Sequence, residues 1–273
     1  MQQPQKKKTN KAIIWIICVE IVVIFVGVIY ILVSESEHNK KRTEDLIGVT
    51  ESIPFTEVDL SSLQLPDICV PCPEIDEQLL SINKYSRPGK KTDPIRYIVI
   101  HYLANPGTTA QENRDYFESL KDLKDVSMSA NYVIGIEGEI IRCVPEGEIA
   151  YASNEENHDS ISIENCHKDR TGIFTEPTYE SLVHLTAYLC DKYKIDRDHI
   201  IRHYDVTGKE CPKYYVKHPK KWEEFKDDVM EYRQQWIDAA ESELQAQKEK
   251  LLETEFDELA AYLESIAETD VSQ

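Results

Sequence analysis

The stretch IIRHYDVTGKECP, residues 200–212, is the most informative part of this chain. It places His203 eight positions before Cys211, and an earlier histidine, His101, ends the apolar run IRYIVIH. Two imidazoles and one thiolate are three of the four ligands that a tetrahedral zinc ion takes, and catalytic zinc sites leave the fourth position to water. We therefore predict that these three residues bind zinc in a hydrolytic rather than a structural site.

Each of the three residues also has an ordinary interpretation. A lone histidine at a strand end is usually a surface residue or a hydrogen-bonded core residue, and a lone cysteine is more often a small buried residue. The order of two strand-end histidines followed by a cysteine favours the metal site. Four other histidines are expected to be solvated (His38, His184, His199 and His218). His158 and His167 flank the SISIE segment, where a place at the rim of a site stays open.

Strands and helices alternate around these residues, which predicts an α/β fold with a mixed sheet. Tyr97–His101 has the nearly continuous apolar pattern of a strand buried on both faces, and SISIEN (160–165) alternates like another strand. SANYVIGIEGEIIRCVPEG (129–147) is typical of a hairpin that turns at Glu137-Gly138. Helical spacing predicts helices at 109–124 and 178–193.

An apolar segment from Ala12 to Val33 predicts an uncleaved transmembrane helix. At 1.5 Å per residue it reaches roughly 33 Å, enough to cross a hydrocarbon core of about 30 Å. Lysines precede it and three basic residues follow it at 40–42, so the charge bias that sets orientation is mild. We expect a single-pass protein of the cell membrane, with residues 1–11 cytoplasmic and the remainder extracytoplasmic.

The sequence divides further after this segment. Residues 34–75 are acidic and proline-containing and predict an extracytoplasmic spacer, residues 76–235 predict the catalytic domain, and residues 236–273 predict an acidic helical extension. An apolar stripe on that extension is expected to dock either on the domain or on another copy of the chain, which makes self-association a candidate interaction. The stripe consists of Leu252, Phe256, Leu259, Leu263 and Ile266.

The net charge narrows the possible partners, and the cysteine pattern indicates which thiols are structural. A formal net charge of −19 argues against nucleic acid as a partner and offers no overall attraction to an anionic cell wall. Of the seven cysteines, Cys69 and Cys72 form a CVPC motif that we interpret as a local disulfide or an inert pair rather than a redox centre. Three others lie in apolar runs and are expected to be small core residues (Cys143, Cys166 and Cys190).

Four separate segments, in register, resemble the N-acetylmuramoyl-L-alanine amidase type 2 family, which includes phage-lysozyme-type amidases and peptidoglycan recognition proteins. The resemblance extends from about Leu79 to Val229 and leaves out the membrane segment, the spacer and the end of the chain. It implies a central mixed sheet flanked by helices on both faces, with a substrate groove over the zinc. The four segments are HYLANPGTTA, SANYVIGIEGEI, SISIENCH and RHYDVTGKECP.

The resemblance also implies roles for individual residues. His101, His203 and Cys211 match the zinc ligands of the family, Glu164 matches its general base, and Lys209 matches a lysine found beside the metal. The ordinary alternatives are a half-buried structural carboxylate for Glu164 and a surface charge in a turn for Lys209.

Some members use a tyrosine in the strand before the hairpin. The corresponding slot falls at Ala130 and Asn131, with Tyr132 beyond it. A shift of one residue along a strand turns a side chain to the other face, so we assign the base to Glu164 and not to Tyr132.

The implied activity is zinc-dependent hydrolysis of the amide between the lactyl group of N-acetylmuramic acid and the L-alanine of the peptidoglycan stem peptide, carried out by a membrane-anchored bacterial enzyme. The loop ASNEENHD (152–159) is expected to line the groove. The alternative is a module that binds or senses peptidoglycan without cleaving it. Such relatives typically lack the cysteine ligand, so Cys211 favours the enzyme. A redox protein acting through Cys69 and Cys72 leaves the four ordered segments unexplained.

Overall fold

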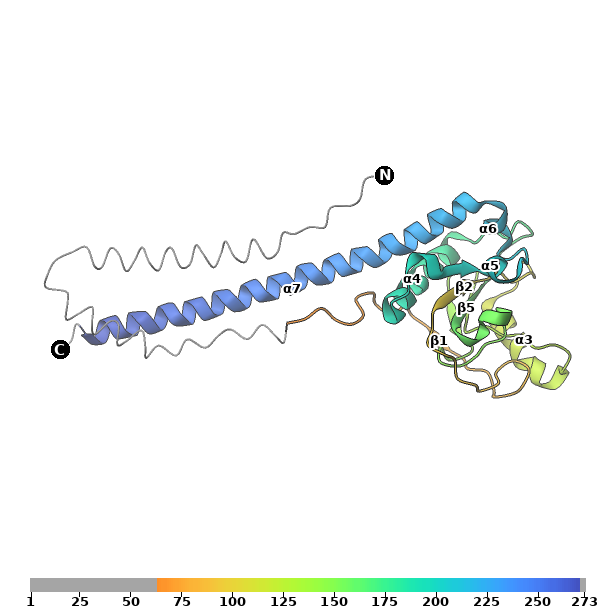
Figure 1. Cartoon of the computed structure of the whole chain (residues 1–273), viewed down its shortest axis with the longest axis horizontal. Coiled ribbons are helices and arrows are strands. Elements are labelled where there is room, and N and C mark those ends of the chain that lie inside the picture. Colours follow the sequence, from red (N-terminus) through yellow and green to blue (C-terminus); the bar gives the residue numbers. More distant parts are fainter. Residues whose placement is uncertain (1–62, 271–273) are drawn as a thin grey trace. The chain divides into compact units, whose positions relative to one another are not determined.

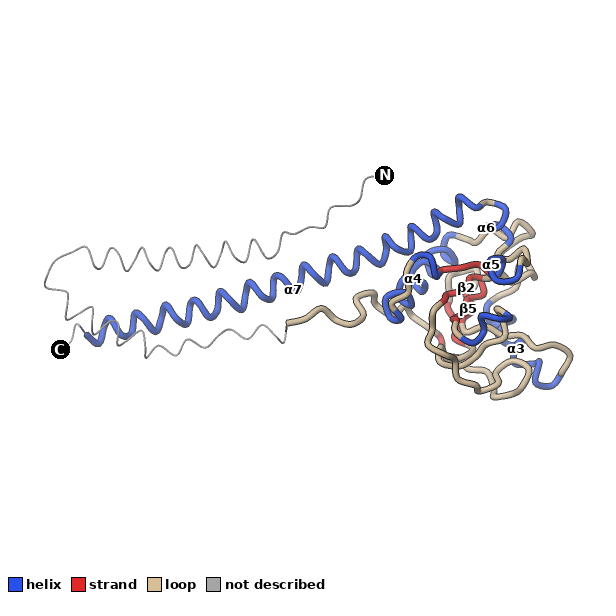
Figure 2. Tube along the Cα trace, viewed as in Figure 1, coloured by secondary structure: helices blue, strands red, loops and turns tan. Residues whose placement is uncertain are grey.

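A computed structural model of the chain describes residues 63–270 (Figures 1 and 2). The predicted cytoplasmic tail, the transmembrane helix at 12–33 and most of the spacer lie outside the described residues. None of the helices between residues 63 and 270 combines the length and the hydropathy that a bilayer crossing needs.

The core of the domain is a six-stranded sheet in the order β1-β4-β3-β5-β2-β6. Only β3 and β4 run antiparallel to each other, and the other neighbouring pairs are parallel, so the sheet is mixed, as predicted. The strands are β1 (Asp76–Glu77), β2 (Tyr97–Ile100), β3 (Tyr132–Ile134), β4 (Ile140–Arg142), β5 (Ser160–Asn165) and β6 (Ile200–Arg202).

The β3–β4 hairpin turns where the sequence predicts it. Gly138 has a φ of +89°, and a Cβ atom there would lie 2.9 Å from the carbonyl oxygen of Pro177. Only glycine combines that left-handed backbone with such a close approach. The turn is thereby packed against the start of helix α4 (Glu176–Tyr193).

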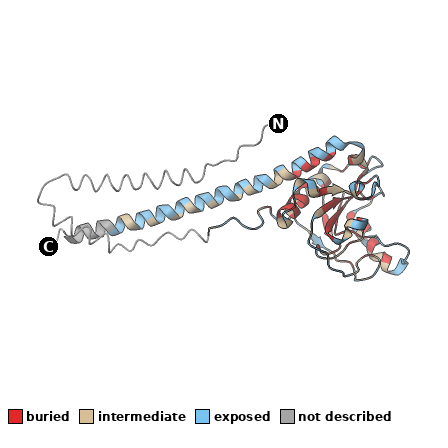
Figure 3. Ribbon diagram, viewed as in Figure 1, coloured by how far each residue is buried: buried red, intermediate tan, exposed pale blue. Residues whose placement is uncertain are grey.

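Helices cover both faces of the sheet, because successive side chains of a strand point to opposite faces. On one face, α4 and the first turns of α7 (Pro219–Asp270) pack on the central strands. On the other face, Phe117 and Leu120 of α3 (Ala110–Leu123) pack with Val133 and Ile141. Figure 3 shows the buried residues concentrated in the sheet and in the helices beside it.

Helix α7 crosses the predicted boundary between the domain and the helical extension. It runs for 52 residues without a break across the expected boundary at 235. Trp222, Phe225 and Val229 are buried against the domain, whereas Leu252 is 47% exposed and Phe256 69% exposed. The catalytic domain and the predicted extension are therefore joined by one continuous helix (Figure 1).

The end of the predicted spacer already packs on the domain. The backbone N–H groups of Cys69 and Val70 donate to the Asp191 carboxylate at 2.5 and 3.0 Å, and Val70 is 1% exposed. The Cys69 and Cys72 thiols are both free, so no local disulfide forms between them. The other three predicted core cysteines are buried (Cys143, Cys166 and Cys190).

Candidate metal centre

Strand neighbours bring the two predicted histidine ligands together. His101 follows β2 directly, and His203 follows β6 directly as the first residue of the short helix α5 (His203–Thr207). Strands β2 and β6 are parallel and paired, with Ile100 opposite Arg202, so both strands end at the same edge of the sheet. The two imidazole ring centroids consequently lie 4.7 Å apart.

A tight return of the chain adds the cysteine. Helix α5 ends at Gly208, whose φ of +76° reverses the chain after only five helical residues. The N–H of Tyr204 then donates to the carbonyl of Cys211 at 2.9 Å, and this hydrogen bond holds the loop after Gly208 against α5. The Cys211 Sγ lies 3.9 Å from Nδ1 of His101, and one donor atom from each of the three residues lies within 4.8 Å of the others.

The three side chains are buried, and burial keeps each of them in its uncharged form. His101, His203 and Cys211 are 1%, 6% and 2% exposed. Burial lowers the pKa of His101 well below its ordinary value and that of His203 to about 4, so both imidazoles are neutral and have a free lone pair. Burial raises the pKa of Cys211 to about 12, so a metal ion must displace the thiol proton to bind.

The donor set fits a zinc ion. Nδ1 of His203 is buried without a hydrogen-bond partner, which is costly in a folded protein unless another group satisfies it. Two imidazole nitrogens and one sulfur are ligands that zinc prefers. The sequence prediction that these three residues meet at one point is thus met by the geometry.

Glu164 lies directly beside this cluster. It projects from β5, with Oε1 3.8 Å from Nδ1 of His101, and its other carboxylate oxygen is buried without a hydrogen-bond partner. Burial raises the pKa of Glu164 to about 7, while the positive charge of Lys209 opposes that rise. A carboxylate whose pKa lies near neutrality is suited to accept a proton and return it.

Lys209 is exposed and close enough to act on the whole cluster through its charge. Its ammonium lowers the pKa of both histidines, of Glu164 and of Cys211. No ion pair to its Nζ is formed by any residue from 63 to 262. The cation is therefore available to a negatively charged group near the cluster.

Ser153 contacts His101, and nothing in the sequence had predicted this contact. It is fully buried, and its Oγ lies 3.0 Å from Nε2 of His101. Asn157 fixes the loop, because its side-chain oxygen accepts from the N–H groups of Ala152 and Ser153 at 3.0 and 2.6 Å. The contact leaves Nδ1 of His101 facing Cys211 and Glu164. One residue of the loop at 152–159 therefore contacts a predicted ligand, and a groove lined by this loop stays a prediction.

We expect Ser153→Ala to weaken zinc binding by about 10- to 100-fold, the usual cost of removing a group that orients a metal ligand. Competition with a chelator measures the affinity. Ser86→Ala is the matched control, since Ser86 is equally buried but bonds Asn83. An unchanged affinity in Ser153→Ala, or an equal loss in both variants, would show that Ser153 does not orient His101.

Two other candidates lie away from the cluster. Tyr132 points to the opposite face of the sheet from Glu164, where its hydroxyl donates to Glu146. His167 is 2% exposed, and its ring nitrogens face the carbonyl oxygens of Leu103 and Asp169, so it is a structural residue rather than a rim residue.

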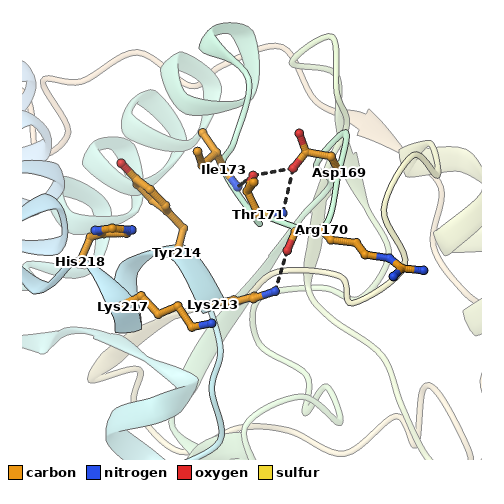
Figure 4. A pocket seen from close by; sticks show the side chains of 8 residues that line it. All are labelled: Asp169, Arg170, Thr171, Ile173, Lys213, Tyr214, Lys217 and His218. Atoms are coloured by element: carbon orange, nitrogen blue, oxygen red, sulfur yellow. Dashed lines mark hydrogen bonds between the residues drawn. The ribbon is translucent and has the colours of Figure 1, made fainter.

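A cavity of about 720 Å³ is lined by residues from 169–173 and 213–218, and by none of the three predicted metal ligands (Figure 4). Its nearest lining residue in the chain is Lys213, two positions after Cys211 and the first residue of helix α6 (Lys213–Lys217). The cavity therefore adjoins the segment that supplies the sulfur ligand.

Comparison with known proteins identifies relatives of this part of the chain. Residues 91–214 match the family model described as N-acetylmuramoyl-L-alanine amidase. The amidase CwlL of Bacillus licheniformis is 33% identical over 156 residues, which cover 52% of this chain and 43% of that protein. The amidase BlyA of Bacillus subtilis (strain 168) is 33% identical over 171 residues, which cover 55% and 45%. The chain thus spans less than half the length of these relatives.

Solved structures share the fold. The PlyG catalytic domain superposes with a TM-score of 0.51 at 23% identity, over 59% of this chain and 95% of that domain. PlyL superposes with a TM-score of 0.50 at 22% identity, over 57% of this chain and 96% of that one.

Proposed function

We propose that the chain is a zinc-dependent peptidoglycan amidase, because residues 91–214 match the N-acetylmuramoyl-L-alanine amidase model and two amidases are 33% identical to it. Its substrate would be the amide between N-acetylmuramic acid and the L-alanine of the stem peptide. The observation that carries the proposal is the convergence of His101, His203 and Cys211 beside Glu164.

The residues around the cluster supply the steps of amide hydrolysis. A zinc ion bound by the three donors would contribute Lewis-acid chemistry and make water acidic near neutral pH. Glu164 takes a proton from the attacking water and passes it to the departing amine of L-alanine. Lys209 places a positive charge near the oxygen that becomes negative as the carbonyl carbon turns tetrahedral.

The complete donor set favours an enzyme over a module that only binds peptidoglycan. A protein that merely senses the polymer has no use for three buried donors together with a carboxylate whose pKa is raised to about 7. Peptidoglycan binding without cleavage is the alternative that the assay below distinguishes.

The proposal is tested by incubating the purified chain, in detergent because of its apolar segment at 12–33, with peptidoglycan. We expect new L-alanine amino termini to appear without new reducing sugar ends. A chelator should stop the release, and added zinc should restore it. If the chain binds peptidoglycan but releases no peptide after zinc loading, it is a binding module.

We further propose that the chain is anchored by the segment at 12–33 with its catalytic domain outside the membrane, which the sequence favours through its apolar length and flanking lysines. Protease added to intact cells should then digest the domain, whereas full protection would refute this orientation. Self-association through the end of α7 stays a prediction.

A further inference from the structure

The short helix α5 needs outside contacts to keep its position. It has only five residues, and a helix of that length is not stable by itself. Its first residue is the predicted ligand His203, and after its last residue Gly208 turns the chain back towards Cys211. A movement of α5 relative to this returning loop would therefore change the distance between the imidazole and the thiol.

Arg202, the last residue of β6, makes a bidentate pair with α5. Its Nε and one terminal nitrogen donate to the two carboxylate oxygens of Asp205 at 3.0 and 2.7 Å. The backbone N–H of Arg202 donates to the same carboxylate at 2.8 Å. Two parallel bonds between planar groups fix orientation as well as distance. The first turn of α5, and with it His203, is thereby tied to the end of β6.

The same guanidinium also contacts the segment that follows Cys211. Its other terminal nitrogen donates to the carbonyl oxygen of Tyr215 at 3.2 Å. Tyr215 lies in α6, and Pro212 joins that helix directly to Cys211. The guanidinium carbon also lies 5.4 Å from the ring centroid of Trp222, which is buried near the start of α7. One side chain, 13% exposed, therefore joins the helix that carries His203 to the helix that follows Cys211.

We propose that Arg202 is a positioning residue of the metal centre, which holds His203 and Cys211 at the separation that lets both bind one metal ion. Arg202 is not itself a ligand, because a guanidinium group only donates hydrogen bonds. The inference rests on the zinc binding in the proposed function and does not use the assignment of the general base. It also makes the start of α7, which lies beyond the family match at 91–214, part of the support of the metal centre.

Zinc affinity, measured by chelator competition on the purified chain in detergent, tests the proposal. We expect Arg202→Met to bind zinc about tenfold less tightly, the lower end of the usual cost of removing a group that orients a metal ligand. Arg202→Lys should lose as much, because an ammonium keeps the charge but lacks the planar fork that bonds Asp205 and Tyr215 together. Asp205→Ala breaks the same pair from its exposed side and should weaken binding similarly, so the test does not depend on the folding of Arg202→Met.

Arg197→Met is the matched control. Arg197 precedes the other end of β6 and binds α7 through the carboxylates of Asp227 at 2.7 Å and Glu223 at 2.8 Å. It also donates to the backbone carbonyl of Glu223 at 3.2 Å, so it makes the same kinds of contact as Arg202. Its loss should lower stability without loosening α5 from α6, and the zinc affinity of the folded protein should stay at the wild-type value.

Modification of Cys211 in the metal-free chain gives a second reading. Cys211 is 2% exposed, so an alkylating reagent reaches its thiol only when the surrounding segments separate. Arg202→Met should raise the rate of this modification, located by mass spectrometry, by about tenfold, because local opening becomes easier. Arg197→Met should leave the rate unchanged.

The outcomes separate this proposal from the function on which it rests. Three results would each overturn the role of Arg202 and leave the amidase assignment intact: unchanged zinc affinity and modification rate in Arg202→Met, equal changes in Arg197→Met, or wild-type affinity in Arg202→Lys. If the wild-type chain takes up no zinc, the proposed function fails instead. The rate of Cys211 modification then still decides whether Arg202 holds the two segments together.

Discussion

Replacing Cys211 with serine is expected to remove the metal from the chain and to abolish peptide release. The sulfur is one of the three donors that residues 63–270 bring together, and a serine hydroxyl is a far poorer zinc ligand at neutral pH than a thiolate. The loss in zinc affinity should exceed about 100-fold, because changes outside the ligand set already cost 10- to 100-fold. Zinc content after dialysis and release of L-alanine amino termini measure the two effects.

A second buried thiol provides the control for this variant. Cys190 is fully buried in α4 and is not part of the cluster, so Cys190→Ser makes the same chemical change in the core. It should lower stability while keeping one zinc and wild-type turnover per folded molecule. If Cys211→Ser retains zinc and digests peptidoglycan as fast as the wild type, the assigned site is wrong.

Replacing Glu164 with glutamine is expected to separate metal binding from turnover. The amide keeps the size of the side chain, so the three metal donors should stay in place and zinc content should not change. Proton transfer is lost, because an amide cannot accept a proton from water, and kcat should fall by about 10²- to 10⁴-fold. Parallel measurements of zinc content and peptide release test both expectations.

Glu155→Gln is the matched control, since Glu155 is an exposed carboxylate in the loop next to Ser153. It removes the same charge nearby without reaching the cluster, and its turnover should remain within about twofold of wild type, as for most surface substitutions. If Glu164→Gln keeps wild-type turnover, Glu164 is a structural carboxylate and not the general base. A loss of zinc in that variant would make it a ligand rather than a base.

The local hydrophobic pattern was sufficient to predict the strands and helices that carry the site. The alternation in SISIEN marks β5 at Ser160–Asn165, and the predicted helices at 109–124 and 178–193 differ from α3 and α4 by at most two residues at either end. These segments are buried on one or both faces, so their hydrophobic period is strong.

The local pattern could not predict which distant segments lie side by side in the fold. The sequence shows that His101 and His203 each follow a strand, but only strand order makes β2 and β6 adjacent. The family resemblance implied that both histidines bind one zinc ion, and therefore that they lie close together. Ser153 had no such signal, because its contact with His101 depends on how Asn157 folds the loop.

The predicted boundary at 235 lies inside a continuous helix. No glycine or proline occurs between residues 220 and 270, so nothing in the sequence interrupts a helix that begins at Pro219. The change in composition from apolar to acidic marks where α7 leaves the domain, and not where the helix ends.

The central claim is that His101, His203 and Cys211 bind one zinc ion together. X-ray absorption at the zinc edge of the metal-loaded chain tests it most directly. We predict one zinc per chain, with one sulfur at about 2.3 Å and two imidazole nitrogens at about 2.0 Å. A chain that takes up no zinc, or a spectrum without sulfur in the coordination shell, would contradict the account.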